Sequence, residues 1–328
     1  MTDAWVTQLQ QLNQRLREEL SDQRLGERSF RRAVLEQQAG PIERMNRLAG
    51  QALEDVLNGG VLVGVDGSIN TYGGQFPYYI DLLRSLAKPS RGNSIFLKGI
   101  HCPMPPEGEA DADTAQRTDN EVRQNKLAHL EVQAALQSID VCLPQVILMD
   151  GPLVRFDMRA KDSFSILKGK VIRKNILLLG CIENIESKVL DTVMGPDAPP
   201  GWRNRFDRDI LWGTLDYGEI VKVTRPGKGL PRQEGDEQAC PLRTWFMRAS
   251  LEPGVVGVEM LEEQVTLVGA MIDYLFTLSP PDGRGIPIWL DLVDREVRLT
   301  NVELDAYFEL LDPQVKRFFQ MKRDARFY

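Results

Sequence analysis

Two apolar runs in the sequence each end in an aspartate that is followed by glycine. Residues 61–65 precede Asp66, and residues 146–149 precede Asp150. Short apolar runs are typical of buried strands, and the carboxyl ends of strands are where open α/β sheets place their sites. Because Asp-Gly is also a common turn dipeptide, a simple turn is the alternative interpretation of each aspartate.

A third carboxylate lies within a helix predicted over residues 118–139. The apolar side chains of that helix share one face: Leu127, Leu130, Ala134 and Ala135. Glu131 falls within this face, whereas Glu121 has polar helical neighbours and is expected to face water. A carboxylate on a buried stripe is costly unless it is paired or binds a metal. Glu131 is therefore expected to bind a metal ion or, alternatively, to pair with Arg155 or Arg173.

A fourth candidate is Asp294, which with Asp291 interrupts the apolar run at residues 285–297, just before a helix. Either aspartate is alternatively a cap or turn residue. Three or four converging carboxylates favour hard divalent cations, Mn²⁺ or Mg²⁺. Two such ions about 4 Å apart hydrolyse phosphodiesters without a histidine or serine nucleophile. The four residues Asp66, Glu131, Asp150 and Asp294 are therefore the candidate metal ligands and catalytic residues.

The elements that must position these residues alternate between helix and strand through the first 190 residues. This order predicts an α/β or mixed α+β core. Helices are predicted at residues 4–24, 42–57, 118–139, 163–174, 262–276 and 301–311, the last capped by Thr300 or Asn301. Strands are predicted at residues 61–65, 95–100, 146–150 and 175–183, with a hairpin formed by 244–250 and 255–261. The loop at 103–116 is rich in proline and acidic residues and is expected to be exposed.

The composition excludes several classes of protein. The chain has 328 residues, is 42% hydrophobic and carries a net charge of −7, which argues against a general nucleic-acid coat protein. Two histidines are too few for a His-rich metal site, and four scattered cysteines form neither a disulfide framework nor a zinc motif. No signal peptide and no apolar run of about 20 residues is present. A cytoplasmic protein is the expectation.

Taken in order, these motifs resemble the NurA family of DNA-end-processing nucleases. The matching features are Val-Asp-Gly-Ser at 65–68, a helical Leu-Glu pair at 130–131, and Leu-Met-Asp-Gly-Pro-Leu at 148–153. The hairpin near 245–260 and the segment GIPIWLDLVD at 285–294 follow in the family's order. The resemblance implies a ribonuclease-H-like mixed α/β fold, with an N-terminal helical region (1–58), a nuclease domain (59–312) and a basic, aromatic tail (313–328).

The same resemblance assigns roles residue by residue. Asp66, Glu131 and Asp150 match the family's acidic metal ligands, while Asp294 stands where the family usually has histidine. Ile286 replaces a usual tyrosine. Glu183 stands where a lysine is common, and Lys188 or Lys168 could substitute for it. Ser68 and the backbone at Gly67 are candidates for orienting water or phosphate.

The resemblance also implies partners and a cellular role. Members form dimers that act with HerA, a hexameric DNA translocase, in resecting double-strand breaks during DNA repair. They cut single strands 5′ to 3′ and also endonucleolytically, often with Mn²⁺, which implies a nucleoid-associated enzyme. The Leu-spaced helix at 4–24 is expected to pack on its own domain or to meet HerA or the dimer mate. Candidate strand-binding residues are Lys168, Lys170, Arg173, Lys174, Arg243 and Arg248, with Tyr72, Phe76 and Tyr78 as base-stacking or core side chains.

Two rival functions come from other classes of protein. A non-catalytic scaffold for DNA or HerA would explain the loss of the family's tyrosine, lysine and histidine. The four retained carboxylates argue against it, because burying unused acids is destabilising. A nucleotide-binding phosphotransferase of actin-like fold also ends strands in Asp-Gly, but the chain lacks a GxxxxGK[ST] phosphate loop.

Overall fold

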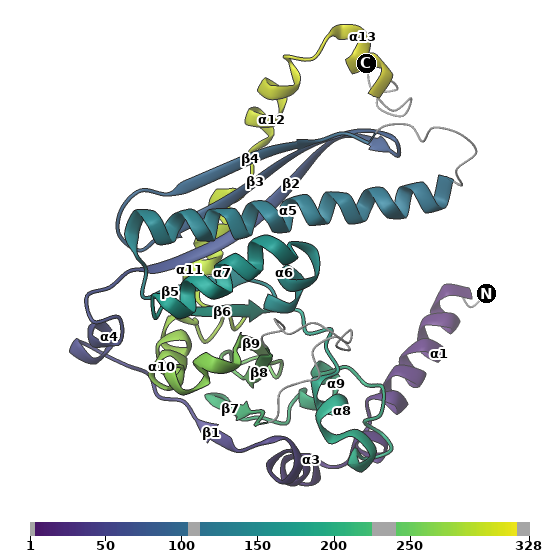
Figure 1. Ribbon diagram of the computed structural model, residues 1–328. Helices are drawn as coiled ribbons and strands as arrows, with labels where there is room; N and C mark the ends of the chain where they lie inside the picture. Colours follow the sequence, from purple (N-terminus) through teal and green to yellow (C-terminus); the bar gives the residue numbers. More distant parts are fainter. Residues whose placement is uncertain (1–3, 104–111, 225–240, 320–328) are drawn as a thin grey trace. The chain divides into compact units, whose positions relative to one another are not determined.

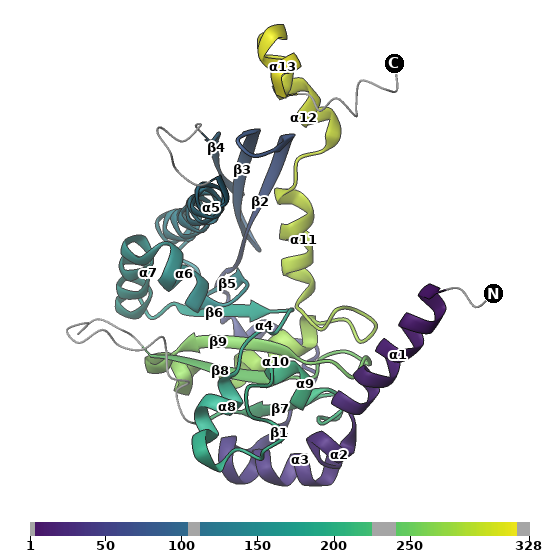
Figure 2. The same cartoon turned by 90° about the vertical axis from the view of Figure 1, so that its right-hand side faces the viewer.

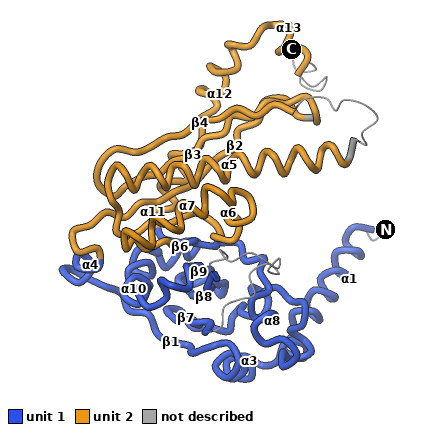
Figure 3. Tube along the Cα trace, in the orientation of Figure 1, with its two compact units in different colours: residues 1–56, 180–287 blue, residues 57–179, 288–328 orange. Residues whose placement is uncertain are grey.

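The computed structural model describes residues 4–103, 112–224 and 241–319. The chain divides into two compact units (Figures 1 and 3). Unit 1 contains residues 1–56 and 180–287, and unit 2 contains residues 57–179 and 288–328. The boundaries at residues 58 and 312 that the sequence suggests stay a prediction. All four candidate carboxylates belong to unit 2.

Unit 2 contains a mixed sheet with the strand order β5-β2-β3-β4. The strands are β2 (Leu62–Gln75), β3 (Tyr78–Pro89), β4 (Ile95–His101) and β5 (Val146–Asp150). β2, β3 and β4 pair antiparallel as a meander, whereas β5 pairs parallel with β2. The β2–β3 hairpin includes the Gly- and Tyr-rich segment at 70–86, for which the sequence pattern predicts no strand.

Helices cover both faces of this sheet. The long helix α5 (Ala112–Cys142) crosses β2, β3 and β4 on one face, and α11 (Ile288–Val297) lies on the other (Figure 2). Two shorter helices, α6 (Leu153–Arg159) and α7 (Lys161–Arg173), contact α5. The unit ends in α12 (Asn301–Phe308), whose N-terminus has a capping box between Thr300 and Glu303, and α13 (Pro313–Phe319).

Unit 1 contains four strands that pair antiparallel. Its strands, in spatial order, are β1 (Ile42–Arg44), β7 (Glu219–Lys222), β8 (Leu242–Met247) and β9 (Val256–Leu261). The strand β6 (Leu177–Ile182) contains the boundary between the units. The helices of unit 1 are α1 (Ala4–Glu19), α2 (Asp22–Leu25), α3 (Arg28–Val34), α4 (Gln51–Val56), α8 (Val189–Met194), α9 (Asp207–Leu211) and α10 (Gly269–Leu278). A π-helix (Leu35–Ala39) and two 3₁₀ helices (Gly195–Asp197, Glu262–Leu267) complete it.

Several expected elements differ in the structure. The helix expected at 4–24 is two helices, and the helix expected at 42–57 is the strand β1 followed by the short α4. Ile42, Glu43 and Arg44 are drawn into a strand because they pair with β7, a contact too distant in sequence to predict. The hairpin and Thr300 cap are confirmed. The acidic loop and the end of the C-terminal tail lie largely outside the described residues.

Among the described residues, no helix combines the length and the apolar character needed to cross a membrane.

Candidate active site

Asp66 and Asp150 are placed side by side by the parallel pairing of β2 with β5. Val65 of β2 is in register with Met149 of β5, so each aspartate is the next residue on its strand. β5 ends at Asp150, while β2 continues to Gln75. The predicted burial of the runs before both aspartates is confirmed, since residues 62–65 and 146–149 are buried. The expectation that each aspartate ends its strand is confirmed for Asp150 and wrong for Asp66, which lies within β2 because β2 stays paired with β3 beyond it. Asp66 itself is only 6% exposed.

Glu131 approaches this strand end from α5, on one face of the sheet. Its side chain is 1% exposed, as expected for a carboxylate on the apolar stripe. Gly67 makes the approach possible: a Cβ there would lie 2.9 Å from Glu131 Cγ and 2.8 Å from Leu127 Cδ1. The glycine after Asp66 therefore leaves the space that Glu131 fills. Glu121, ten residues earlier on the helix, is exposed as predicted.

Asp294 is carried by α11 on the opposite face of the sheet. The sequence suggested that Asp294 precedes a helix; this is wrong, because Asp294 lies within α11. The helix lies close to β2 because Gly64 has no side chain, and a Cβ there would be 2.8 Å from Val293 Cγ2 and 2.9 Å from Trp289 Cδ1. The spacing of Trp289, Val293 and Val297 is helical and forms the packed face.

Arg84 of β3 fastens the C-terminal end of α11. Its guanidinium donates hydrogen bonds to the backbone oxygens of Glu296, Val297 (2.7 Å) and Arg298 (3.0 Å). These carbonyls have no partners within the helix, so a cation is favourable there. Sequence reasoning missed this residue; the available signal was a charged side chain within the apolar run of the segment at 80–87.

The carboxylates interact strongly with one another. Burial, together with the charges of Asp150, Glu131 and Asp294, raises the pKa of Asp66 to about 8. The Gly67 amide, which donates to Asp66 Oδ1 at 2.6 Å, opposes part of this rise. Burial also raises the pKa of Glu131, and the Arg155 guanidinium opposes that shift. The cluster therefore concentrates negative charge that the protein compensates only in part.

Two arginines engage two of the four carboxylates. Arg155 Nη2 lies 2.9 and 2.8 Å from the two oxygens of Glu131, and 3.3 Å from the backbone oxygen of Asp150. Arg298 Nη2 lies 2.6 Å from Asp294 Oδ1, one helical turn away. The alternative that Glu131 pairs with an arginine is thus confirmed for Arg155.

The carboxylate oxygens of the cluster suit a hard divalent cation, but two of the carboxylates are paired with arginines. Buried carboxylate oxygens that raise one another's pKa are the ligands that Mg²⁺ and Mn²⁺ prefer. Yet within the described ranges no three Asp, Glu, His or Cys side chains are already arranged to hold an ion. Glu131 and Asp294 are instead paired with Arg155 and Arg298.

The other residues singled out in the sequence are engaged elsewhere. Ser68 Oγ donates to the backbone oxygen of Val297 at 2.9 Å, which ties β2 to α11. Lys168 is buried and pairs with Asp157 at 2.7 Å. Glu183 pairs with Arg284 at 2.7 Å. Ile286 is buried, and Lys188 Nζ lies over the ring of Phe206.

Of the candidate residues for binding a DNA strand, some are engaged within the protein and others are exposed. Arg243 is buried and pairs with Glu262, and Lys170 pairs with Asp140. Arg248 donates to backbone oxygens, while Arg173 and Lys174 are exposed. The aromatic candidates Tyr72 and Tyr78 pack against Phe308 and Phe318 of the C-terminal helices.

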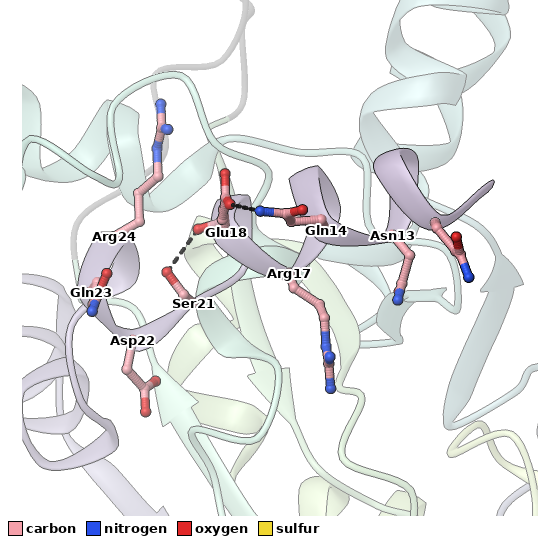
Figure 4. A pocket seen from close by; sticks show the side chains of 9 residues that line it. Asn13, Gln14, Arg17, Glu18, Ser21, Asp22, Gln23 and Arg24 are labelled. Atoms are coloured by element: carbon pink, nitrogen blue, oxygen red, sulfur yellow. Dashed lines mark hydrogen bonds between the residues drawn. The ribbon is translucent and has the colours of Figure 1, made fainter. Parts of the chain in front are cut away.

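A separate polar hollow lies along α1 and α2 in unit 1 (Figure 4). Its volume is about 1060 Å³, and its lining includes Asn13, Arg17 and Asp22. Gln14 donates to Glu18 at 3.0 Å, and Ser21 donates to the Glu18 backbone oxygen at 2.7 Å. Gln14 and Ser21 thus form hydrogen bonds with Glu18, and none of the four clustered carboxylates lines this hollow.

Comparison with known proteins places the chain in a family. The fold is similar to that of the NurA nuclease from Sulfolobus solfataricus, with 14% identity, a TM-score of 0.56, and coverage of 96% of this chain and 95% of that chain. Endonuclease V from Ciona intestinalis, bound to a 24mer DNA with an inosine followed by a ribo-adenosine, matches at 13% identity and a TM-score of 0.39. That match covers 85% of this chain and 96% of that chain. The catalytic domain of human endonuclease V matches at 13% identity and a TM-score of 0.38. That match covers 82% of this chain and 93% of that chain.

The similarity to the Sulfolobus structure, over nearly the whole of both chains, confirms the predicted mixed α/β fold. No curated protein sequence matches the chain. The family model of the NurA domain matches residues 60–299, the region that holds all four carboxylates. The chain therefore belongs to the NurA family.

Proposed function

We propose that the protein is a divalent-metal-dependent nuclease that hydrolyses DNA. The observation that carries this proposal is the carboxylate cluster, in which Asp150, Glu131 and Asp294 each raise the pKa of buried Asp66. Burying a carboxylate such as Asp66 beside other acids is costly, and we propose that metal binding is the function for which this cost is retained. Membership of the NurA family supports the nuclease assignment.

Asp66 and Asp150 are proposed to hold the metal where the pairing of β2 with β5 stops, with Glu131 and Asp294 completing the ligand set. Two bound Mn²⁺ or Mg²⁺ ions would supply an activated water and stabilise the departing oxygen of the phosphodiester. The protein's own part is positioning: β2, β5, α5 and α11 hold the carboxylates rigidly, and Arg84 fixes α11. Arg155, once Glu131 no longer needs it, remains beside the strand ends as a cation for the phosphate.

The test compares two glutamates on one helix. Cleavage of labelled single-stranded DNA would be measured with Mn²⁺, Mg²⁺ or EDTA, for the wild type, Glu131→Gln, Asp150→Asn and Glu121→Gln. We expect metal-dependent cutting by the wild type and Glu121→Gln, and a loss of about 100-fold or more in the other two. Circular dichroism would show that every variant is folded. Cutting in EDTA, or by Glu131→Gln and Asp150→Asn at the wild-type rate, would contradict the proposal.

The family also supports a role with HerA in end resection, and a homodimer. Helix α1 is amphipathic: one side lines the polar hollow of Figure 4, while Leu9, Leu12 and Leu16 on the other are more than 50% exposed. We propose that this apolar side meets HerA or a second copy of the chain. Co-purification of tagged protein with HerA, and light scattering of the protein alone, would distinguish the two.

One observation favours a second function, a DNA- or HerA-binding scaffold. Glu131 and Asp294 already pair with arginines, as they would in a site that no longer takes metal. Calorimetric titration with Mn²⁺ decides between the two functions. Binding that Glu131→Gln weakens supports the nuclease, whereas no binding, together with DNA retention and no cutting, supports the scaffold.

A further inference from the structure

A second polar groove lies in unit 2, between β2, β3 and the first turns of α5. Its volume is about 580 Å³. The lining includes Thr71, Phe76, Tyr79, Arg117, Asn120 and Arg123. Among the described residues, no carboxylate lines this groove, although the chain as a whole carries a net charge of −7. Two arginines, two aromatic rings and amide groups without an acid are suited to an anionic ligand that has flat apolar faces.

Asp81 and Asp119 hold side chains of the groove in place. Asp81, which is fully buried, lies 2.7 Å from Nε of Arg123, and Nη2 of Arg123 donates to Thr71 at 2.8 Å. The guanidinium lies 5.6 Å from the centre of the Tyr79 ring. The hydroxyl of Tyr79 donates to Asp119. Ring and guanidinium are therefore fixed before any ligand arrives, which lowers the entropic cost of binding.

Arg117 supplies a charge that the protein itself does not use. It is exposed on α5 and makes no ion pair with any described residue. By contrast, Lys168, Lys170 and Arg243, which the sequence suggested as DNA contacts, are all paired. Among the positive side chains near β2, Arg117 is thus available for a phosphate.

The groove shares its two supporting elements with the carboxylate cluster. Thr71 lies five residues beyond Asp66 on β2, about 17 Å along the strand, and Arg123 lies eight residues before Glu131 on α5, about 12 Å along the helix. The pairing of β5 with β2 stops at Val65, so this length of β2 pairs only with β3 within the described sheet of unit 2. One strand edge therefore runs from the cluster to the groove.

From this arrangement we propose that the groove is a subsite for single-stranded DNA, a few nucleotides from the bond that the carboxylates cleave. The proposal rests on the proposed nuclease function. A base stacks on Phe76 or Tyr79, and the adjoining phosphate binds Arg117 and Arg123. Stacking requires bases that are not paired in a duplex. At the duplex spacing of 3.4 Å per nucleotide, the separation corresponds to roughly four to five nucleotides, and to fewer in an extended strand.

The first test measures binding without cleavage. Fluorescein-labelled (dT)₁₂ would be titrated with protein in EDTA, and its anisotropy followed at several salt concentrations. For Arg117→Gln we expect about five- to tenfold weaker binding, and a slope of log K against log salt smaller by about 0.7, one phosphate contact. Phe76→Leu should weaken binding about fivefold or more without changing the slope. Arg91→Gln, which changes an exposed arginine of the β3–β4 loop, should bind as the wild type. Wild-type affinity and slope in Arg117→Gln would overturn the proposal.

The second test locates the bound strand. Oligonucleotides with a single 5-iododeoxyuridine at successive positions would be irradiated with the protein in EDTA, and the cross-linked peptides identified by mass spectrometry. We expect cross-links to Phe76 or Tyr79 from one or two adjacent positions only. Cross-links that map solely outside residues 71–79 and 116–123 would refute the groove.

The experiments distinguish a failure of the groove proposal from a failure of the proposed nuclease function. Binding and cross-linking that depend on Arg117, in a protein that cuts nothing with Mn²⁺, would retain the groove and remove the nuclease. Cutting at the wild-type rate by Arg117→Gln, with unchanged affinity, would retain the nuclease and remove the groove.

Discussion

The carboxyl of Asp66 lies in surroundings that disfavour its charge. It is buried, three other acids raise its pKa, and the Gly67 amide donates a hydrogen bond to its Oδ1. Its ordinary pKa, 3.8, is raised to about 8 because ionisation in this environment is unfavourable. The metal-free fold therefore holds a proton at Asp66 that the unfolded chain releases.

This difference predicts how the stability of the metal-free protein depends on pH. Between about pH 4 and pH 8 the folded state binds more protons at Asp66 than the unfolded state, so stability falls as pH rises through that window. Urea unfolding in EDTA at pH 5, 6.5 and 8 would measure it. Asp66→Asn should be more stable than the wild type at pH 8 and should show a flatter profile. An equally steep decline in Asp66→Asn would assign the effect to another group.

Arg155 is predicted to compete with metal for Glu131. Removing it in Arg155→Met leaves a buried carboxylate unpaired, which should cost about 3–5 kcal/mol of stability in EDTA. Because the same carboxylate is then free to bind, Mn²⁺ should raise the melting temperature more in Arg155→Met than in the wild type. Arg159→Met, which changes the last residue of the same helix, is the control. A smaller Mn²⁺ shift in Arg155→Met would show that Arg155 supports the metal site instead.

Sequence reasoning identified the four acids because each interrupts an apolar pattern at a position where burial is expected. It could not identify their partners, because the sequence alone gives no reason to prefer Arg155 over Arg173 as the partner of Glu131. Nor could it find the groove: Arg117, Arg123 and Tyr79 are unremarkable residues in sequence, and only the packing of α5 on the β2–β3 hairpin brings them together.

The elements that build the site depend on close approach between helices and β2. Gly64 admits α11 on one face, and Gly67 admits Glu131 and Leu127 of α5 on the other. Sequence patterns predicted α5 and β5 well, since their apolar residues are local and periodic. They failed for β1 and for the β2–β3 hairpin, whose strands are specified by partners and by a glycine-rich sequence that propensity disfavours.

Gly67→Ala is predicted to displace Glu131. The added Cβ would lie within 3.0 Å of atoms of Leu127 and Glu131, so we expect a loss of about 1–3 kcal/mol in urea unfolding. Mn²⁺ should also stabilise the variant less than the wild type. Gly269→Ala at the start of α10 is the matched control, because a Cβ there meets nothing within 4 Å. Equal effects of the two substitutions would show that the space at Gly67 is not required.

At the scale of the whole molecule, α1 is predicted to control association. It has no buried residue, and its apolar side would remain in water in an isolated chain. Replacing Leu9 and Leu16 by Gln should therefore lower the mass measured by light scattering, or abolish co-purification with HerA, while leaving the unfolding transition unchanged. Replacing Gln10 and Arg17, on the polar side, by Ala is the control. Unchanged mass and unchanged HerA retention in the leucine variant would exclude α1 as the contact.

Each unit is built from two separate segments of the chain, which determines when it can fold during protein synthesis. Unit 2 contains residues 57–179 but also requires residues from 288 onward, and unit 1 is likewise divided. Val293 and Val297 pack on Leu86 over a long sequence separation, and such non-local contacts form late in folding. A nascent chain therefore lacks α11, and with it Asp294, until the second segment of unit 1 has been synthesised. The proposed carboxylate site would stay incomplete up to that point, even though Asp66, Glu131 and Asp150 had already been made.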